Sequence, residues 1–312
     1  MPHTHQPLYR YAAPRHWPVW TGLGLLRLVC LLPHRMALGV GAAIGRLAAR
    51  LGARRRAIVR RNLALCFPEL DPAERDALVR RHFEAIGMSL VEFGLARWAS
   101  ERHLADLSDI EGLEHVLDAV NAGRGVLLLS AHFTTIEICA TIAKRYLPPF
   151  DAVYRSTRDP FVTALLKSNR ERGGARLIEK RDIKTAVRSL RQGRIVWYAP
   201  DQSYDRKGSA VIPFFGVPSM HTTATSTLAR LGNAVTIPFF PERTPDGRYR
   251  LRVLPPLEDF PSDDLAADTM RYVAVLEKFI RRCPEQYFWL HRKFKNLPAS
   301  HPDYYADLDA WK

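Results

Sequence analysis

Short apolar runs that alternate with helical patterns constrain the fold of this chain more than any other feature. Residues 126–130, Val-Leu-Leu-Leu-Ser, follow two glycines and have the composition of a fully buried strand. Further apolar runs occupy residues 152–154, 195–198 and 235–237. Helical patterns fall between or beside them, at residues 135–146, 160–172, 183–191 and 222–231. The alternation predicts an α/β domain with a mostly parallel sheet flanked by helices.

The last third of the chain adds a different strand pattern. Residues 248–254 alternate between polar and apolar side chains, as a half-exposed strand does, and Pro-Asp-Gly at 245–247 is a turn sequence. We therefore expect a hairpin between this strand and one at residues 235–240. A final helix is predicted at about residues 263–282.

Basic residues are concentrated at the start of the chain. The formal net charge of the 312 residues is +14, and residues 1–68 hold eleven arginines but no lysine and no acid. The first carboxylate is Glu69, and from it onward the other 35 basic residues face 32 acidic ones, Glu69 included. This asymmetry predicts an anionic partner for the N-terminal region.

An apolar segment, residues 17–32, lies among these arginines. It begins with Trp17 and Trp20, carries Arg27 at its centre and ends before Pro33. A nucleic-acid-binding arm would rarely carry such an apolar segment, and a cleaved signal peptide would need small residues after it. A membrane anchor, either a marginal span or an in-plane helix, fits both the charge and the tryptophans. The alternative is an ordinary amphipathic helix packed on its own domain.

Residues 71–74, Asp-Pro-Ala-Glu, form the capping box that starts a helix, which the pattern extends to about Arg97. We therefore divide the chain into a basic, membrane-anchoring helical region at residues 1–105 and an α/β catalytic domain at residues 106–312. No run of about 20 uncharged apolar residues exists, which excludes a polytopic membrane protein. The four cysteines are far apart, which excludes a disulfide scaffold and a cysteine-built zinc site.

His132 follows the buried strand at 126–130, where open α/β sheets bind their ligands. Glu137 lies five residues later and can meet the imidazole if His132 is in the turn and Glu137 in the first helical turn. His132 would then be a general base, and Glu137 would hold its tautomer. The spacing alone is weak evidence, and a structural histidine is the alternative. The chain has no G-x-S-x-G elbow, which disfavours a covalent acyl-serine.

Four segments together resemble one family. Residues 131–137, Ala-His-Phe-Thr-Thr-Ile-Glu, resemble the HX4D/E block of the glycerolipid acyltransferases, in the glutamate form of the lipid A biosynthesis acyltransferases. The other three segments, residues 55–69, 201–216 and 284–292, are similar in the same order to the N-terminal, central and C-terminal blocks of that family. The resemblance spans roughly residues 15 to 295.

The resemblance implies transfer of a fatty acyl chain from acyl carrier protein to a hydroxyl of a lipid A precursor that carries Kdo sugars. It implies a site at the cytoplasmic face of the bacterial inner membrane, with no cofactor other than the acyl-carrier donor, no metal and no nucleic-acid partner. A lysophospholipid or glycerol-phosphate acyltransferase, and a non-catalytic membrane-binding relative, are the alternatives.

The resemblance also suggests substrate-binding residues. Arg155 and Arg170 match arginines of the family and could bind a phosphate, although Arg170 could instead be a solvated helix residue. Asp201 opens the central block, where a simple turn aspartate is the alternative. Arg206 and Lys207 would form a basic loop that holds a phosphate or the phosphopantetheine arm, or they are solvated loop charges.

Overall fold

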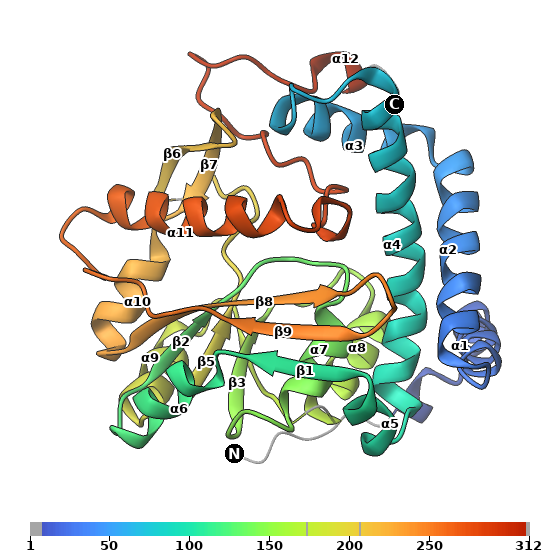
Figure 1. The fold of residues 1–312 in the computed structure, drawn as a ribbon, viewed down its shortest axis with the longest axis horizontal. Helices are drawn as coiled ribbons and strands as arrows, with labels where there is room; N and C mark the ends of the chain where they lie inside the picture. The colour runs from blue at the N-terminus through green and yellow to red at the C-terminus, as the bar shows by residue number, and fades with distance from the viewer. Residues whose placement is uncertain (1–7, 173, 206, 310–312) are drawn as a thin grey trace.

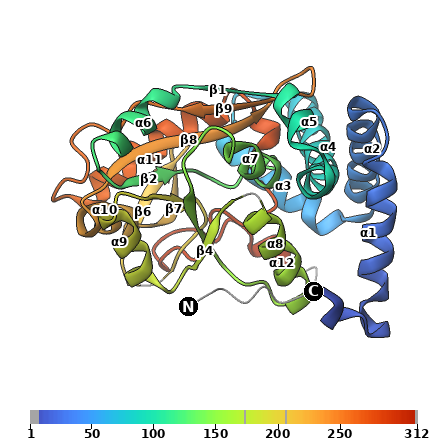
Figure 2. The ribbon, with the colours of Figure 1, turned by 90° about the horizontal axis from the view of Figure 1, so that it is seen from below.

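A seven-stranded sheet forms the centre of the molecule in the computed structural model, which describes residues 8–172, 174–205 and 207–309. The strand order is β1-β9-β8-β2-β5-β3-β4, with β4 labelled in Figure 2 and the other strands in Figure 1. All pairings are parallel except that of β8 with β9. The strands are β1 Ser108–Glu111, β2 Val126–Leu129, β3 Phe150–Tyr154, β4 Arg176–Glu179, β5 Ile195–Tyr198, β8 Val235–Arg243 and β9 Tyr249–Val253. The mostly parallel sheet and the β8–β9 hairpin are therefore confirmed.

The helices follow the predicted alternation closely. They are α1 Trp17–Val29, α2 His34–Leu51, α3 Ala53–Cys66, α4 Pro72–Trp98, α5 Glu101–Asp106, α6 Leu113–Asn121, α7 Ile136–Ala143, α8 Pro160–Arg172, α9 Ile183–Arg191, α10 Ala224–Gly232, α11 Leu265–Ile280 and α12 Ala306–Asp309. Helices α8 and α9 have the predicted bounds. Strands β1 and β4 and a separate hairpin of β6 (Ser209–Phe214) with β7 (Val217–Thr222) were not predicted.

Helices cover both faces of the sheet, and β2 shows how the chain builds the two cores. Leu127 and Leu129 belong to the core under α9, α10 and α11, whereas Val126 and Leu128 belong to the core under α6 and α7. Because side chains alternate across a strand, a fully apolar β2 supplies both cores at once. Helix α4 also contributes residues to both cores, so the N-terminal helices are packed against the sheet domain.

The N-terminal helices form a layer at one side of the molecule (Figures 1 and 2). Helix α4 begins with the predicted capping box between Asp71 and Glu74. Helix α2 lies against it through glycines: a Cβ atom on Gly45 would be 2.0 Å from the Phe83 carbonyl oxygen, and one on Gly87 would be 2.0 Å from that of Gly41. The two helix backbones are therefore in direct contact at this crossing.

Helices α1 and α2 and the turn between them are rich in exposed apolar side chains, which are Trp17, Leu25, Leu28, Leu31, Leu32, Met36, Ile44, Leu47 and Leu51. We call this set the apolar outer face. Within the described residues, no helix taken singly has the length and hydropathy of a bilayer span. Helices α2 and α3 reach that threshold only as a pair, with a 98° bend between them.

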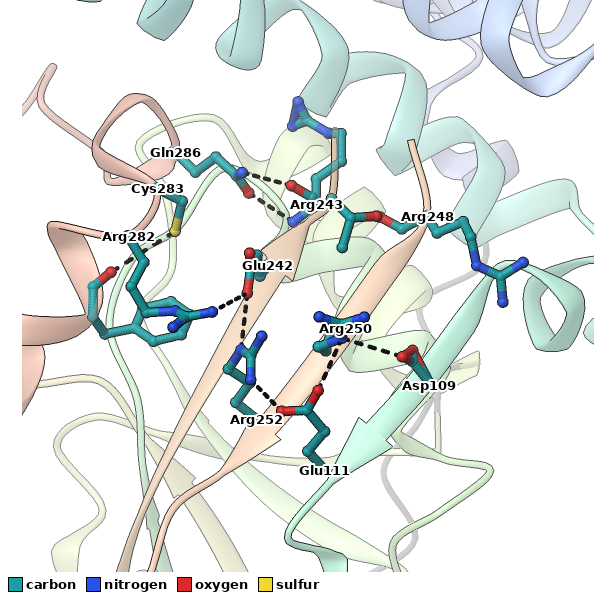
Figure 3. Close-up of polar contacts among 12 residues, drawn as sticks. Asp109, Glu111, Glu242, Arg243, Arg248, Arg250, Arg252, Arg282, Cys283 and Gln286 are labelled. Atoms are coloured by element: carbon teal, nitrogen blue, oxygen red, sulfur yellow. Dashed lines mark hydrogen bonds and ion pairs between the residues drawn. The ribbon is translucent and has the colours of Figure 1, made fainter. Parts of the chain in front are cut away.

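Ion pairs tie together the three strands at the β1 edge of the sheet (Figure 3). On β9, Arg250 bonds Asp109 at 3.2 Å and Arg252 bonds Glu242 at 2.9 Å. Glu111 of β1 lies between the two arginines and contacts both. Each of these arginines faces a carboxylate on a neighbouring strand. The ion pairs therefore favour this register of the three strands.

Candidate active site

His132 and Asp201 meet at the carboxyl ends of β2 and β5, two adjacent parallel strands. The Nδ1 atom of His132 is 2.7 Å from Asp201 Oδ1, and the backbone N–H of His132 donates to Asp201 Oδ2 at 3.2 Å. A carboxylate can only accept hydrogen bonds, so Nδ1 carries the proton and Nε2 of the neutral ring holds the free electron pair. The pair therefore presents a histidine whose tautomer suits a general base.

The charge on Asp201 is fixed by its surroundings. The side chain is 1% exposed, and burial alone would raise its pKa. The charge and hydrogen bonds of His132, with a further contribution from Lys293, outweigh burial and hold the pKa well below the usual range. Asp201 is therefore ionised at neutral pH and stabilises a positive imidazole when His132 takes up a proton.

Glu137 does not contact His132, so the prediction that it orients the imidazole was wrong. Its carboxylate binds Arg170, with Nη2 to Oε1 at 2.5 Å and Nε to the two oxygens at 3.2 and 3.3 Å. Glu137 is in the first turn of α7 and Arg170 is in the last turn of α8, and these helices pack together. A catalytic role for Glu137 stays a prediction, but its direct partner is Arg170.

Arg170 is partly buried in this pair, with 22% of its side chain exposed, so it is not a solvated helix residue. Burial opposes its charge, yet the carboxylate of Glu137 raises the pKa of the guanidinium above its ordinary value. The bidentate geometry fixes the plane of the guanidinium.

A polar pocket of about 160 Å³ opens in front of His132. Its basic lining residues are Arg155, Arg170 and Lys180. Its other lining residues, beside His132 itself, are Ile136, Val153, Tyr154, Trp197, Tyr198, Ala199, Pro200, Gln202, Tyr204 and Thr222. The pocket thus combines a histidine base with several positive charges, as a site for an anionic substrate requires.

A second, narrow pocket of about 30 Å³ adjoins the first, since Ile136, Arg170 and Trp197 line both. It runs between α7 and the central strands, and its remaining lining includes the apolar side chains of Cys139, Leu147, Phe150 and Phe239. Almost all of its wall is apolar. The polar pocket that holds His132 therefore adjoins a small apolar cavity, whose volume is below that of a whole fatty acyl chain.

The other predicted residues differ in how close they lie to the polar pocket. Arg155 is exposed on the rim of the polar pocket. Asp201, which we predicted as a substrate-binding residue, instead has its carboxylate buried against His132. Lys207 is exposed on a loop, and Arg206 lies outside the described residues. No group of three side chains able to hold a metal ion occurs in the part of the chain that the structure describes.

Sequence reasoning missed two aromatic residues of the site. Trp197, on β5, forms the wall between the two pockets, and Tyr287 donates a hydrogen bond to Asp201 Oδ2 at 3.1 Å. Tyr287 lies within the segment 284–292 that carried the C-terminal resemblance, so a signal existed. The resemblance did not reveal that the Tyr287 hydroxyl would contact the Asp201 carboxylate.

A histidine–aspartate pair at the carboxyl edge of a mostly parallel sheet, next to a basic pocket, is the arrangement of an enzyme that uses a histidine general base. The chain matches the sequence profile of the bacterial lipid A biosynthesis acyltransferases over residues 5–296. It is 40% identical over 294 residues to the lipid A biosynthesis lauroyltransferase of Escherichia coli (strain K12), covering 94% of this chain and 96% of that protein. The palmitoleoyltransferase of the same organism is 35% identical, covering 94% and 95%, and the myristoyltransferase is 29% identical, covering 90% and 88%. The protein therefore belongs to the bacterial lipid A biosynthesis acyltransferase family.

Proposed function

We propose that this acyltransferase moves a fatty acyl chain from acyl carrier protein to a hydroxyl of a lipid A precursor bearing Kdo, at the cytoplasmic face of the bacterial inner membrane. The observation that carries the proposal is the His132–Asp201 pair beside a basic pocket that adjoins an apolar one. The relatives named above are lipid A acyltransferases, and the alignments with this chain cover nearly their whole length.

The geometry supports direct transfer with no cofactor. His132 Nε2 takes the proton of the acceptor hydroxyl, and Asp201 stabilises the imidazolium that forms. The hydroxyl oxygen attacks the thioester carbonyl, a C–O bond forms, and the C–S bond breaks as the tetrahedral intermediate collapses. The leaving thiolate receives the proton from His132, which returns the base to its starting state.

The two pockets divide the substrates between them. At about 30 Å³ the apolar pocket would have to widen to take an acyl chain, whose carbonyl carbon would then lie near the shared residues Ile136 and Trp197. The polar pocket would hold the acceptor and the donor arm. Because Arg170 is already paired with Glu137, Arg155 on the rim is the freer candidate for a phosphate.

The surface next to the polar pocket suits an acidic carrier protein. Lys180 and Tyr204 line both this pocket and a neighbouring hollow that reaches Ile183 at the start of α9. The exposed basic residues nearby in the sequence are Arg155, Arg158, Arg181, Lys184, Arg188 and Lys207, and they outnumber the exposed acidic residues among them, which are Asp159, Glu179, Asp182 and Asp205. A basic surface of this kind steers an acidic partner to the site.

The apolar outer face supports membrane association. Its leucines are well exposed, with Leu28 at 61% and Leu31 at 64%, on a protein whose first 68 residues carry eleven arginines and no acid. Exposed apolar patches rimmed by positive charge bind anionic lipid surfaces. An in-plane anchor explains the exposure without a transmembrane span.

Acyl transfer can be tested directly with purified protein. The purified protein is incubated with acyl carrier protein that carries a fatty acid and with a Kdo-bearing lipid A precursor. The mass of the product is then measured by mass spectrometry. We expect the precursor to gain the mass of one acyl chain, and His132→Ala to abolish the gain. Acylation of lysophosphatidic acid in place of the precursor would contradict the proposed acceptor.

Membrane association is tested by replacing leucines on the apolar outer face. We expect the double variant Leu28→Glu, Leu31→Glu to lose most of its binding to vesicles of phosphatidylglycerol and phosphatidylethanolamine in a sedimentation assay. Leu231→Glu is the matched control, because Leu231 is 44% exposed on α10, away from this face. Equal binding by both variants would show that the face does not hold the membrane.

A further inference from the structure

One C-terminal segment, residues 286–295, contacts the loops of both His132 and Asp201. On the His132 side, the Phe288 N–H donates to the His132 carbonyl at 2.9 Å, and the Thr134 N–H donates to the Gln286 carbonyl at 2.8 Å. These bonds surround an isolated antiparallel bridge between Phe133 and Tyr287. The segment therefore adds a short strand-like edge to the turn that carries the histidine.

The start of this segment is anchored to the sheet through Gln286 (Figure 3). The Gln286 side chain accepts from the Arg243 N–H at 2.7 Å and donates to the Arg243 carbonyl at 2.8 Å. Arg243 ends β8, which pairs with β2. The segment is thus fixed to the same sheet that positions His132 and Asp201.

On the Asp201 side, the segment supplies two side chains that bind the same residue. The Tyr287 hydroxyl donates to Asp201 Oδ2 at 3.1 Å, and Lys293 Nζ donates to the Asp201 backbone carbonyl at 2.6 Å. Oδ1 accepts from His132 Nδ1, so each acceptor oxygen of Asp201 has a named donor. The aspartate can neither rotate nor shift without breaking one of these bonds.

Lys293 is an unusual partner, because its side chain is 2% exposed. Its Nζ lies 3.2 Å from His221 Nε2 on β7 and over the Phe214 ring of β6. The charged or titratable groups that influence it are Asp201, His221, His291, Cys66 of α3 and Glu277 of α11. Burial lowers its pKa to about 8, while Asp201, Cys66 and Glu277 oppose that shift. An isolated buried ammonium is costly, so the site retains it against a clear penalty.

We propose that Tyr287 and Lys293 are positioning residues for the reaction, which hold Asp201 so that its Oδ1 faces His132 and restrain how strongly it attracts the imidazole proton. The inference rests on the proposed function of His132 as the general base. Tyr287 acts on the carboxylate and Lys293 on the backbone beside it. Neither residue touches the substrate pockets as the structure describes them.

The sign of the effect follows from the charges. The Tyr287 hydroxyl and the Lys293 ammonium both draw on the negative charge of Asp201. Removing either leaves Asp201 a stronger partner for the protonated imidazole, so His132 stays protonated to higher pH. The acidic limb of the pH–rate profile should then move to higher pH. A merely structural role would lower the amount of folded protein and leave that limb in place.

The test compares Tyr287→Phe and Lys293→Met with the matched control Tyr305→Phe. Tyr305 is equally buried, and its hydroxyl bonds Asn62 and the Phe294 N–H but not Asp201. We expect Tyr287→Phe to lower kcat about tenfold, as loss of a hydrogen bond to a charged group does, with KM for both substrates unchanged. Lys293→Met should cost more, and Lys293→Arg, which keeps the charge, should recover part of the loss.

A second measurement does not depend on acyl transfer. The imidazole signals of histidine-labelled protein are followed by NMR across pH, and the His132 signal is identified by its absence in His132→Ala. We expect the His132 titration to move to higher pH in Tyr287→Phe and to stay unchanged in Tyr305→Phe. If transfer fails but this shift occurs, the proposed function is wrong and the positioning role stands.

The inference is overturned if Tyr287→Phe keeps the wild-type kcat, pH–rate limb and His132 titration while losing thermal stability to the same degree as Tyr305→Phe. If Lys293→Met does not fold, Tyr287→Phe alone still decides the matter, because it changes one hydroxyl and no volume.

Discussion

Two buried aspartates, one on a strand of the central sheet and one just beyond a strand end, are used in different ways. Asp151, on β3, receives four N–H donors: Arg176 binds it through Nε at 2.9 Å and Nη2 at 2.5 Å, and Arg194 through Nε at 3.3 Å and Nη2 at 2.8 Å. Asp201, after β5, binds a histidine whose side chain is 36% exposed. Both carboxylates have a pKa below the ordinary value despite burial.

The difference lies in the partner that each aspartate holds. The two arginines of Asp151 are permanently charged, so nothing in that cluster can exchange a proton at neutral pH. His132 can, and its free nitrogen faces a pocket. Burial and a low pKa therefore do not separate a structural carboxylate from a catalytic one. What separates them is whether the bound partner can exchange a proton.

The largest expected effect is on Asp201. Asp201→Asn keeps the shape of the side chain but allows the amide to donate, which favours the wrong tautomer of His132. We expect kcat to fall by about 10³- to 10⁴-fold, by analogy with other histidine–aspartate pairs, with the fold intact. Steady-state kinetics and circular dichroism check this. Retention of more than a tenth of the wild-type rate would remove Asp201 from the catalytic pair.

Asp151→Asn should reverse that pattern. Removing the buried carboxylate from two partly exposed arginines should cost about 2 kcal/mol in free energy of unfolding, with little change in kcat per folded molecule. Because the arginines lower the pKa of Asp151, its contribution is present above the unfolded value of about 3.9 and is lost as pH falls through the lower folded value. Urea titrations at pH 7 and pH 3 should show a smaller difference between variant and wild type at pH 3. A large fall in kcat with unchanged stability would contradict the structural assignment.

The smallest expected effect is on Glu137. Because its carboxylate contacts Arg170 and not His132, Glu137→Gln should act only by loosening the guanidinium that lines both pockets. We expect about a tenfold loss of kcat/KM and an unchanged acidic limb of the pH–rate profile. A loss as large as that of Asp201→Asn would show that Glu137 takes part directly in proton transfer.

The parts of the fold that could be predicted from the sequence are those with a clear pattern within a short stretch of residues. The central strands and helices α8 and α9 follow apolar runs of ordinary length, and the capping box marks the start of α4. Strands β1 and β4 are four residues each, with charged residues in both, so neither pattern stands out. Their pairing with β9 and β3 depends on tertiary contacts that no short window contains.

The site divides in the same way. His132 was found because it follows a buried strand, a local signal. Its carboxylate partner was misassigned, because Glu137 is near in sequence whereas Asp201 is brought in by the next strand of the sheet. Pairing Arg170 with Glu137 likewise required knowing how α7 packs on α8. Spacing in one sequence cannot show which of two carboxylates contacts the histidine when one of them is distant in sequence and is brought close only by strand pairing.

The contact between α2 and α4 limits which sequences can be reached from this one by single substitutions. A side chain at Gly45 or Gly87 would enter the space of an opposing carbonyl oxygen at 2.0 Å, and backbone atoms cannot be made smaller by mutation. No second substitution can therefore rescue the first, as a smaller neighbour often rescues an enlarged core residue. Random libraries over these helices should yield glycine alone at both positions, while the exposed leucines a few residues away should vary freely as long as they stay apolar.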